Sequence, residues 1–144
     1  MSNNWVWDME RMHGKYGVRD VIETFDKEKL TAFLKFRIDF LQEELDEMRK
    51  AVVDFQSGKI SGNKAADDVV DALIDLCVVA IGTLDAYQVD CLEAWNRVLD
   101  ANMAKEIGIK HSRPNPLGLP DLIKPEGWIA PTHADNVGLL AKAF

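Results

Sequence analysis

Residues 27–56 read KEKLTAFLKFRIDFLQEELDEMRKAVVDFQ, and this proline-free stretch decides the fold. Seven of its apolar residues alternate spacings of four and three, which is the a/d pattern of a helix seam kept over three heptads. They are Leu34, Ile38, Leu41, Leu45, Met48, Val52 and Phe55. The pattern predicts one long helix with a packing face along this seam.

Proline and glycine mark where the long helices end. No proline occurs between residues 27 and 107, whereas five prolines and three glycines fall between residues 108 and 131. Proline interrupts helices because it lacks an N–H donor and clashes with the preceding turn. The expected helices span about residues 4–15, 27–56, 63–87 and 89–107. We expect a linker at 17–26, a turn at 57–62, no strands, and a loop-rich tail over 108–144 with room for a short terminal helix.

Short loops between long amphipathic helices predict an all-α fold, an antiparallel four-helix bundle with a Pro/Gly-rich C-terminal tail. The chain has 144 residues and a mass of 16.2 kDa, so we expect a single domain over 1–144 with a helical core at about 4–107. The residues of the last core helix expected to face inward are Leu92, Trp95, Val98 and Leu99. Phe33, Phe36 and Phe40 lie outside the seam, so we expect copies of the chain to associate through helix faces.

The chain is acidic, with 24 Asp and Glu against 17 Lys and Arg and a net charge of −7. Nucleic-acid backbones and anionic membranes attract cationic proteins, so neither is an expected partner. Cys77 and Cys91 lack a zinc-binding spacing, and the N-terminus lacks the pattern of a signal peptide. The apolar run at 72–84 is too short to span a bilayer. We therefore expect a cytoplasmic protein.

The predicted helix at 63–87 carries acids on an otherwise apolar surface. Residues 69–84 read VVDALIDLCVVAIGTL, and Asp68, Asp71 and Asp75 are spaced by three and four, which places them on one stripe. Ionised carboxylates on a buried stripe need a partner or a cation. We expect no Lys or Arg on that stripe, so compensation must come from another helix or from a metal ion.

The first long helix carries Glu43, Glu44 and Glu47 beside its seam. Antiparallel packing of the two long helices brings Glu47 opposite Asp68, and Glu44 opposite Asp71 one turn further along. Converging carboxylates repel one another unless cations lie between them, and ligation by oxygen alone favours Mg²⁺, with Mn²⁺ also suitable. The residues therefore predict a metal site made of two acidic pairs. The alternative is that each pair belongs to a solvated helix face.

The two pairs form the pattern E-x-x-E, an interval of twenty residues, then D-x-x-D. This pattern resembles the signature of the all-α nucleoside triphosphate pyrophosphohydrolases, the MazG-like superfamily that includes dimeric dUTPases and phosphoribosyl-ATP pyrophosphohydrolases. The segments NMAK at 102–105 and KPEGW at 124–128 are similar to elements of its phage and bacterial members. The resemblance covers about residues 8–131.

The resemblance implies a reaction, a cofactor and a set of site residues. Such an enzyme uses Mg²⁺ to hydrolyse a (deoxy)nucleoside triphosphate between the α and β phosphates, which releases a nucleoside monophosphate and pyrophosphate. The expected catalytic residues are Glu43, Glu44 and Glu47, with Glu43 or Glu44 as the base that deprotonates water. The expected metal ligands are Glu44, Glu47, Asp68 and Asp71. The expected substrate contacts are Lys35, Arg37, Asp75, Asn102 and Lys105.

Two departures from the family pattern bear on this assignment. Asp68 stands where the family usually has Glu, and its shorter side chain can shift ligand duty to Asp67 or Asp75. Residues 73–76 read LIDL where phosphoribosyl-ATP enzymes of histidine synthesis carry an aromatic–His pair, which argues against that branch.

Several alternatives remain open at this point. The enzyme alternatives are a dUTP- or dCTP-specific diphosphatase and a phosphoribosyl-ATP pyrophosphohydrolase, and the non-enzymatic one is a helical dimerisation module. The resemblance implies a homodimer or a homotetramer. Lys35 and Arg37 have the alternative role of pairing with helix acids. The candidate contacts to the nucleobase are Trp5, Trp7, His13, Tyr16 and Trp95.

Overall fold

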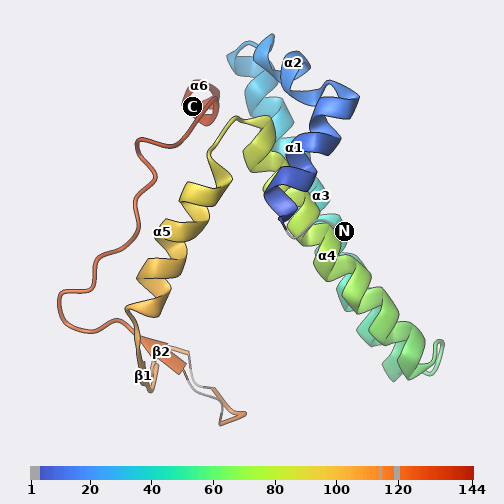
Figure 1. The fold of residues 1–144 in the computed structure, drawn as a ribbon. Coiled ribbons are helices and arrows are strands. Elements are labelled where there is room, and N and C mark those ends of the chain that lie inside the picture. Colours follow the sequence, from blue (N-terminus) through green and yellow to red (C-terminus); the bar gives the residue numbers. More distant parts are fainter. Residues whose placement is uncertain (1–3, 114, 119–120) are drawn as a thin grey trace. The chain divides into compact units, whose positions relative to one another are not determined.

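The structure is a computed structural model that describes residues 4–113, 115–118 and 121–144. In chain order its elements are α1 (Trp5–Tyr16), α2 (Val18–Glu23), α3 (Lys27–Gln56), α4 (Gly62–Ala86), α5 (Cys91–Met103), β1 (Glu106–Gly108), β2 (Asp121–Ile123) and α6 (Leu140–Ala143) (Figure 1). The predicted all-α class is confirmed. The chain divides into two compact units: unit 1 contains the residues up to 91 together with 137–144, and unit 2 contains 92–136.

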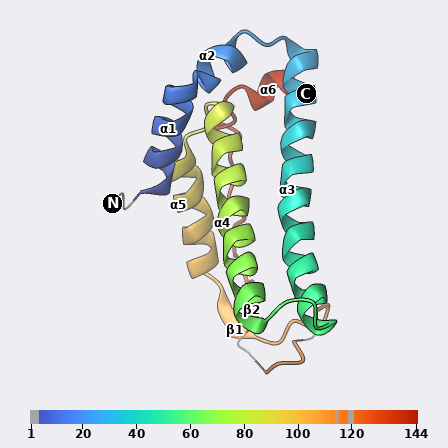
Figure 2. The same cartoon turned by 90° about the vertical axis from the view of Figure 1, so that its right-hand side faces the viewer.

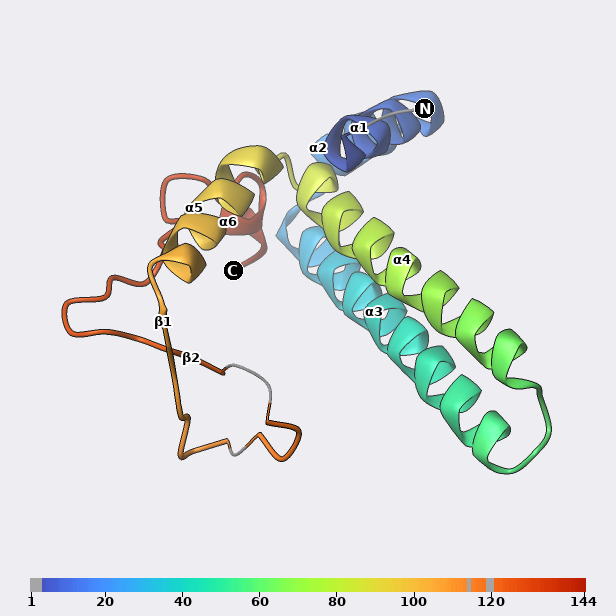
Figure 3. The ribbon, with the colours of Figure 1, turned by 60° about the horizontal axis from the view of Figure 1, so that its bottom comes forward.

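Two long antiparallel helices, α3 and α4, form the frame of unit 1 (Figure 3). The Asp26 side chain caps α3 by accepting from the Lys29 backbone N–H at 2.9 Å. Ser61 caps α4 in the same way, accepting from the Lys64 N–H at 3.2 Å. The predicted bounds of α3 agree with the structure, and those of α4 agree to within one or two residues.

The packing face of α3 differs from the predicted seam. Ile38, Val52 and Phe55 belong to that seam, yet they are 55%, 44% and 51% exposed. The buried and half-buried stripe with the same spacing consists of Leu30, Leu34, Arg37, Leu41, Glu44, Met48 and Ala51. Three of the seven positions are thus shifted by one residue, onto Arg37, Glu44 and Ala51, and two of these are polar residues that an apolar pattern cannot identify. The shift moves Glu44 from the margin of the packing face onto it.

The N-terminal helix α1 packs along α4 within unit 1 (Figure 2). The Asn4 side chain caps it, accepting from the backbone N–H groups of Val6 and Trp7 at 3.1 and 3.3 Å. Helix α2 lies in the segment predicted as a linker. Its single buried residue, Ile22, anchors only six residues, which is too short a run for a helical period to appear in the sequence.

The last residues return to unit 1 beside the start of α3. Thr31 Oγ1 donates to the Ala143 carbonyl at 2.6 Å, and the Leu139 N–H donates to the Tyr87 carbonyl at 2.7 Å. Tyr87 is fully buried and its hydroxyl donates to the Leu30 carbonyl at 2.5 Å. The C-terminal segment, α4 and α3 therefore meet at one tyrosine.

Substitution of Gly138 by Ala is expected to undock this C-terminal segment. Gly138 has φ of 51°, and a Cβ there would lie 2.1 Å from the Tyr87 carbonyl oxygen. Gly17→Ala is the matched control, since its φ is 68° but no atom lies within 4 Å of the added carbon. We expect the control to lose about 1–2 kcal/mol from backbone strain alone. Gly138→Ala should lose about 1–3 kcal/mol more, measured by urea unfolding; equal losses would contradict the docking contact.

Unit 2 contains most of α5, the strand pair and the segment up to residue 136. The strands are antiparallel, with Glu106 opposite Ile123 and Gly108 opposite Asp121. The prediction that the tail has no strands is therefore wrong, because three-residue strands are too short to show an alternating pattern.

Helix α5 ends at Met103, not near residue 107. The four α5 residues predicted to face inward are 39–65% exposed. Among the described residues, no helix is long and apolar enough to cross a membrane.

Candidate functional site

Glu44 lies among other carboxylates on the face of α3 that packs against α4. Its Oε2 atom is buried and has no hydrogen-bond partner in the described chain. Burial raises the pKa of Glu44 above its usual range, and the negative charges of Glu47, Asp75, Glu43 and Asp71 raise it further. Charges from both of the predicted pairs are therefore felt at Glu44.

None of these acids forms an ion pair with a described residue, so their negative charges are not neutralised within the described chain. A buried carboxylate oxygen without a donor, with further negative charges around it, costs free energy unless a cation neutralises it. The donor set consists of carboxylates alone, which is the set that Mg²⁺ and Mn²⁺ prefer. The residues thus fit a hard divalent cation in their chemistry. In the described part of the chain, no three Asp, Glu, His or Cys side chains lie close enough together to hold one ion.

Asp68 is placed differently from the other predicted ligands. Lys64 forms an ion pair with Asp68, and its Nζ also lies 3.5 Å from Asp67 Oδ2. The prediction that this stripe carries no Lys or Arg is therefore wrong: α4 begins at Gly62, so Lys64 already lies one helical turn before Asp68. Asp75 contributes to the raised pKa of Glu44, whereas Asp68 is held in its ion pair with Lys64.

Arg37, a predicted substrate contact, links the two long helices. Its Nε donates to Thr83 Oγ1 and its Nη2 to the Val79 carbonyl, both at 2.9 Å, and burial lowers its pKa. Arg37 forms no ion pair with a described acid, so its alternative role as a partner of helix acids is not found. Lys35 is exposed and likewise forms no ion pair with a described residue. In unit 2, Lys105 Nζ donates to Asn102 Oδ1 at 2.7 Å.

Asp85 is a buried acid that the sequence reasoning missed. It is 1% exposed and accepts from His13 Nδ1 at 2.6 Å, from Arg19 Nε at 3.3 Å and from Arg19 Nη2. His13 is 6% exposed, so this candidate base contact is held inside unit 1. The only signal in the sequence was an acid that ends the apolar run of α4. Its partners lie more than sixty residues away, beyond the reach of local spacing.

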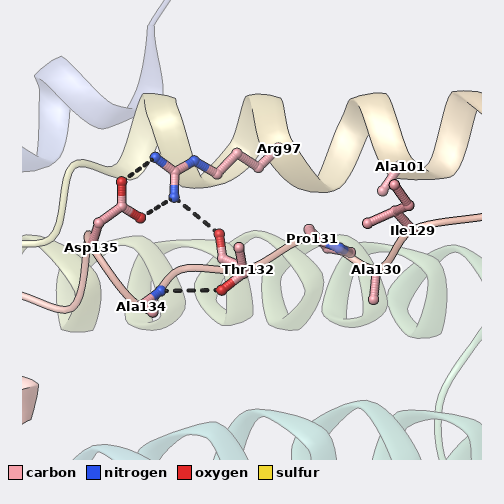
Figure 4. Close-up of a pocket in the computed structure, with 8 residues that line it drawn as sticks. All are labelled: Arg97, Ala101, Ile129, Ala130, Pro131, Thr132, Ala134 and Asp135. Atoms are coloured by element: carbon pink, nitrogen blue, oxygen red, sulfur yellow. Dashed lines mark hydrogen bonds and ion pairs between the residues drawn. The ribbon is translucent and has the colours of Figure 1, made fainter.

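A hollow of about 640 Å³ lies in unit 2 between α5 and the segment 129–135 (Figure 4). Its charged residues pair with each other, because Arg97 donates to both Asp135 oxygens at 2.5 and 3.0 Å and to the Thr132 carbonyl at 3.0 Å. The guanidinium lowers the pKa of Asp135 to about 2. None of the predicted site residues lines this hollow, so the acids around Glu44 remain the candidate site.

Comparison with models of protein families matches residues 18–102 to PRA-PH, phosphoribosyl-ATP pyrophosphohydrolase. The matched range contains every acid around Glu44, and it ends at Asn102. A search of curated proteins finds no match. Residues 73–76 were expected to argue against the phosphoribosyl-ATP branch. They lie inside the matched range, so the absence of the aromatic–His pair at these positions does not exclude the chain from the family.

Proposed function

Because the chain belongs to the phosphoribosyl-ATP pyrophosphohydrolase family, within the MazG-like superfamily of enzymes that hydrolyse phosphoric anhydrides, we propose that it is a Mg²⁺-dependent nucleoside triphosphate pyrophosphohydrolase. It cleaves a (deoxy)nucleoside triphosphate between the α and β phosphates. The observation that carries this proposal is the buried, unbonded Glu44 oxygen among four other acids. Nucleotide phosphates are anionic, so these acids can serve a nucleotide only with cations between the two.

We assign the cation to Glu44, Glu47 and Asp71, joined by Asp75 more readily than by Asp68. Their side chains turn toward the ion when it binds, since no three described side chains lie within reach of one ion as they stand. The support for Asp75 is its effect on the pKa of Glu44, and Asp68 is already paired with Lys64. When bound, a divalent ion neutralises phosphate oxygens and makes bound water more acidic. Mn²⁺ has similar ligand preferences and is expected to replace Mg²⁺.

Proton transfer from the attacking water is assigned to Glu43. It is exposed and forms no ion pair with a described residue, so its carboxylate is available to accept a proton. Glu44 is half-buried with its Oε2 atom fully buried, so it is better suited to hold the cation. Lys35, Arg37, Asn102 and Lys105 remain predicted substrate contacts.

The substrate class has a second candidate. The matched family is named for phosphoribosyl-ATP, which carries the same kind of phosphoric anhydride bond. The proposed partner is in either case a free nucleotide in the cytoplasm, since a net charge of −7 disfavours polyanionic strands and anionic membranes.

We also propose a homodimer or homotetramer formed through helix faces. Apolar side chains of α3 and α4 are exposed in the single chain, among them Phe36 at 51%, Ile38 at 55% and Val70 at 61%. Exposed apolar faces of this kind are typical of surfaces that another protein covers. Light scattering on the purified protein measures the number of copies, and a monomer would contradict this part of the proposal.

The reaction is tested by measuring pyrophosphate release from a panel of canonical and modified dNTPs, with dUTP, dCTP and phosphoribosyl-ATP included, in the presence of Mg²⁺. Glu47→Gln is expected to lower the rate by about 100-fold or more. Asp46→Asn is the matched control, because Asp46 is the exposed neighbour that pairs with Arg49 at 2.9 Å. If the unsubstituted protein hydrolyses no nucleotide faster than the Glu47→Gln protein does, the assignment is refuted. The helical dimerisation module is then the remaining alternative.

A further inference from the structure

A pocket of about 180 Å³ lies between α1 and α4 in unit 1. The α1 residues that line it are Trp5, Asp8 and Met9, and the α4 residues are Ile74, Cys77, Val78 and Ile81. Pockets that enclose a whole drug-sized ligand have volumes of roughly 300–1,000 Å³. The volume of this pocket therefore suits a single ring system, with the rest of the ligand outside it.

The walls of the pocket are suited to a flat ring. Apolar side chains of α4 form one side, and Trp5 of α1 is 56% exposed, so its indole is available to stack on a planar ligand. Stacking on an aromatic side chain does not distinguish one nucleobase from another, because every base has a π-face. A choice among bases has to come from a polar group of the pocket.

Asp8 is that polar group, and among the described lining residues it alone is charged. Its Oδ1 atom accepts from Arg11 Nη2 at 2.9 Å, and the Arg11 side chain is 80% exposed. Exposed ion pairs contribute little to stability, so a ligand can replace Arg11 at small cost. Asp8 Oδ2 accepts no hydrogen bond from a described residue. An ionised carboxylate only accepts hydrogen bonds, so a matching ligand brings N–H donors.

The pocket is continuous along α4 with the proposed cation site. Val78 lies three residues after Asp75 and seven after Asp71, so the three share one stripe of the helix. At about 1.5 Å per residue, Val78 is about 5 Å and about 10 Å along the axis from these two acids. A single sugar joins the base of a nucleotide to its phosphates. Phosphates bound through a cation at the acids therefore leave the base next to this pocket.

We propose that the pocket holds the base of the substrate nucleotide and that Asp8 selects guanine, an inference that rests on the proposed function. Guanine presents two adjacent donors, its ring N1–H and its exocyclic amino group, which match the two oxygens of one carboxylate. Adenine and cytosine present an amino group beside a ring nitrogen that is an acceptor and repels the carboxylate. Thymine and uracil present one N–H between two carbonyl groups, which also repel it.

The test is calorimetric titration of the full-length protein with deoxyguanosine, deoxyinosine and thymidine, which carry no phosphate and need no cation. Deoxyinosine lacks only the amino group of guanine, and we expect its Kd to be about tenfold or more above that of deoxyguanosine. Asp8→Asn is expected to lose this difference, because its amide offers one acceptor and one donor. Asp20→Asn is the matched control, an exposed acid of unit 1 outside the pocket, and it should keep the difference.

Each outcome decides the inference. Tighter binding of deoxyguanosine that is lost in Asp8→Asn and kept in Asp20→Asn supports it. No binding of deoxyguanosine, equal Kd values for deoxyguanosine and deoxyinosine, or a difference that survives in Asp8→Asn overturns it.

Hydrolysis of the matching triphosphates separates this inference from the proposed function. We expect kcat/KM to be about tenfold or more higher for dGTP than for dITP, and to be similar for the two in Asp8→Asn. Hydrolysis at equal kcat/KM would overturn the role of Asp8 and leave the proposed function standing. Binding of deoxyguanosine through Asp8 in a protein that hydrolyses no nucleotide would overturn the proposed function and leave a guanine pocket.

Discussion

Glu44→Gln is expected to stabilise the metal-free protein and to abolish its hydrolytic activity. The amide removes one of several like charges and offers an N–H group to the neighbouring carboxylates. Relief of one unsatisfied buried group is worth about 1 kcal/mol or more. For a chain of this size that corresponds to a rise in Tm of about 3 °C. Pyrophosphate release should fall by about 100-fold or more, because the residue assigned to the cation is lost.

The pH dependence of this stabilisation follows from the raised pKa of Glu44. A carboxyl group whose pKa is higher in the folded than in the unfolded protein binds its proton more tightly when folded. Its contribution to stability is present below the unfolded pKa and is lost as the pH rises through the folded pKa. The difference in Tm between Glu44→Gln and the unsubstituted protein should therefore be largest at neutral pH and shrink as the pH falls toward the usual range of glutamate.

The matched control is Asp39→Asn, since Asp39 is an exposed acid of the same helix and is not one of the proposed ligands. Thermal unfolding in EDTA, followed by circular dichroism, measures all three proteins. A Glu44→Gln protein that melts below both the others at neutral pH would show that the Glu44 carboxylate is satisfied in the fold.

Asp85→Asn is expected to have the largest effect on stability. The substitution leaves His13 and Arg19 facing a neutral group at a position that is 1% exposed. Removal of one partner from a buried charge pair typically costs 3–5 kcal/mol. Arg19 is 41% exposed and keeps part of its hydration, so we expect a loss of about 3 kcal/mol. Urea unfolding measures the loss as a lower midpoint at unchanged slope.

Asp46→Asn serves as the control for Asp85→Asn. Its ion pair with Arg49 is exposed on both sides, at 62% and 66% of the two side chains. Exposed pairs contribute at most about 1 kcal/mol. Equal losses in the two variants would mean that the bonds of Asp85 to His13 and Arg19 do not hold α1 and α2 against α4.

Much of unit 1 can be predicted from the sequence. The spacing of apolar residues over 27–56 and the caps Asp26 and Ser61 are local signals, and they locate α3 and α4. The packing face of α3 includes Arg37 and Glu44 in place of Ile38 and Leu45 of the predicted seam, because hydrophobicity alone does not indicate which polar residues face a neighbouring helix. The short elements α2, β1 and β2 carry too few residues for any period.

The candidate site was predictable in part for the same reason. Acids three and four apart on neighbouring helices predict a cluster, and the charges of Glu43, Glu47, Asp71 and Asp75 are close enough to raise the pKa of Glu44; the metal site itself stays a prediction. The pairing of Lys64 with Asp68 was within reach of the sequence, because the two residues are four apart inside the predicted helix. The bonds of Asp85 depend on contacts between distant segments, which no local pattern contains.

A magnesium titration of thermal stability tests the central claim most directly. A ligand that binds only the folded protein stabilises it by about 2.7 kcal/mol at a free concentration of about 100 times Kd. We predict that Mg²⁺ raises the Tm of the unsubstituted protein and of Asp39→Asn, and leaves that of Glu44→Gln unchanged. A Tm that does not respond to Mg²⁺ or Mn²⁺ in any of the three proteins, or that responds equally in all of them, would contradict a cation site at Glu44.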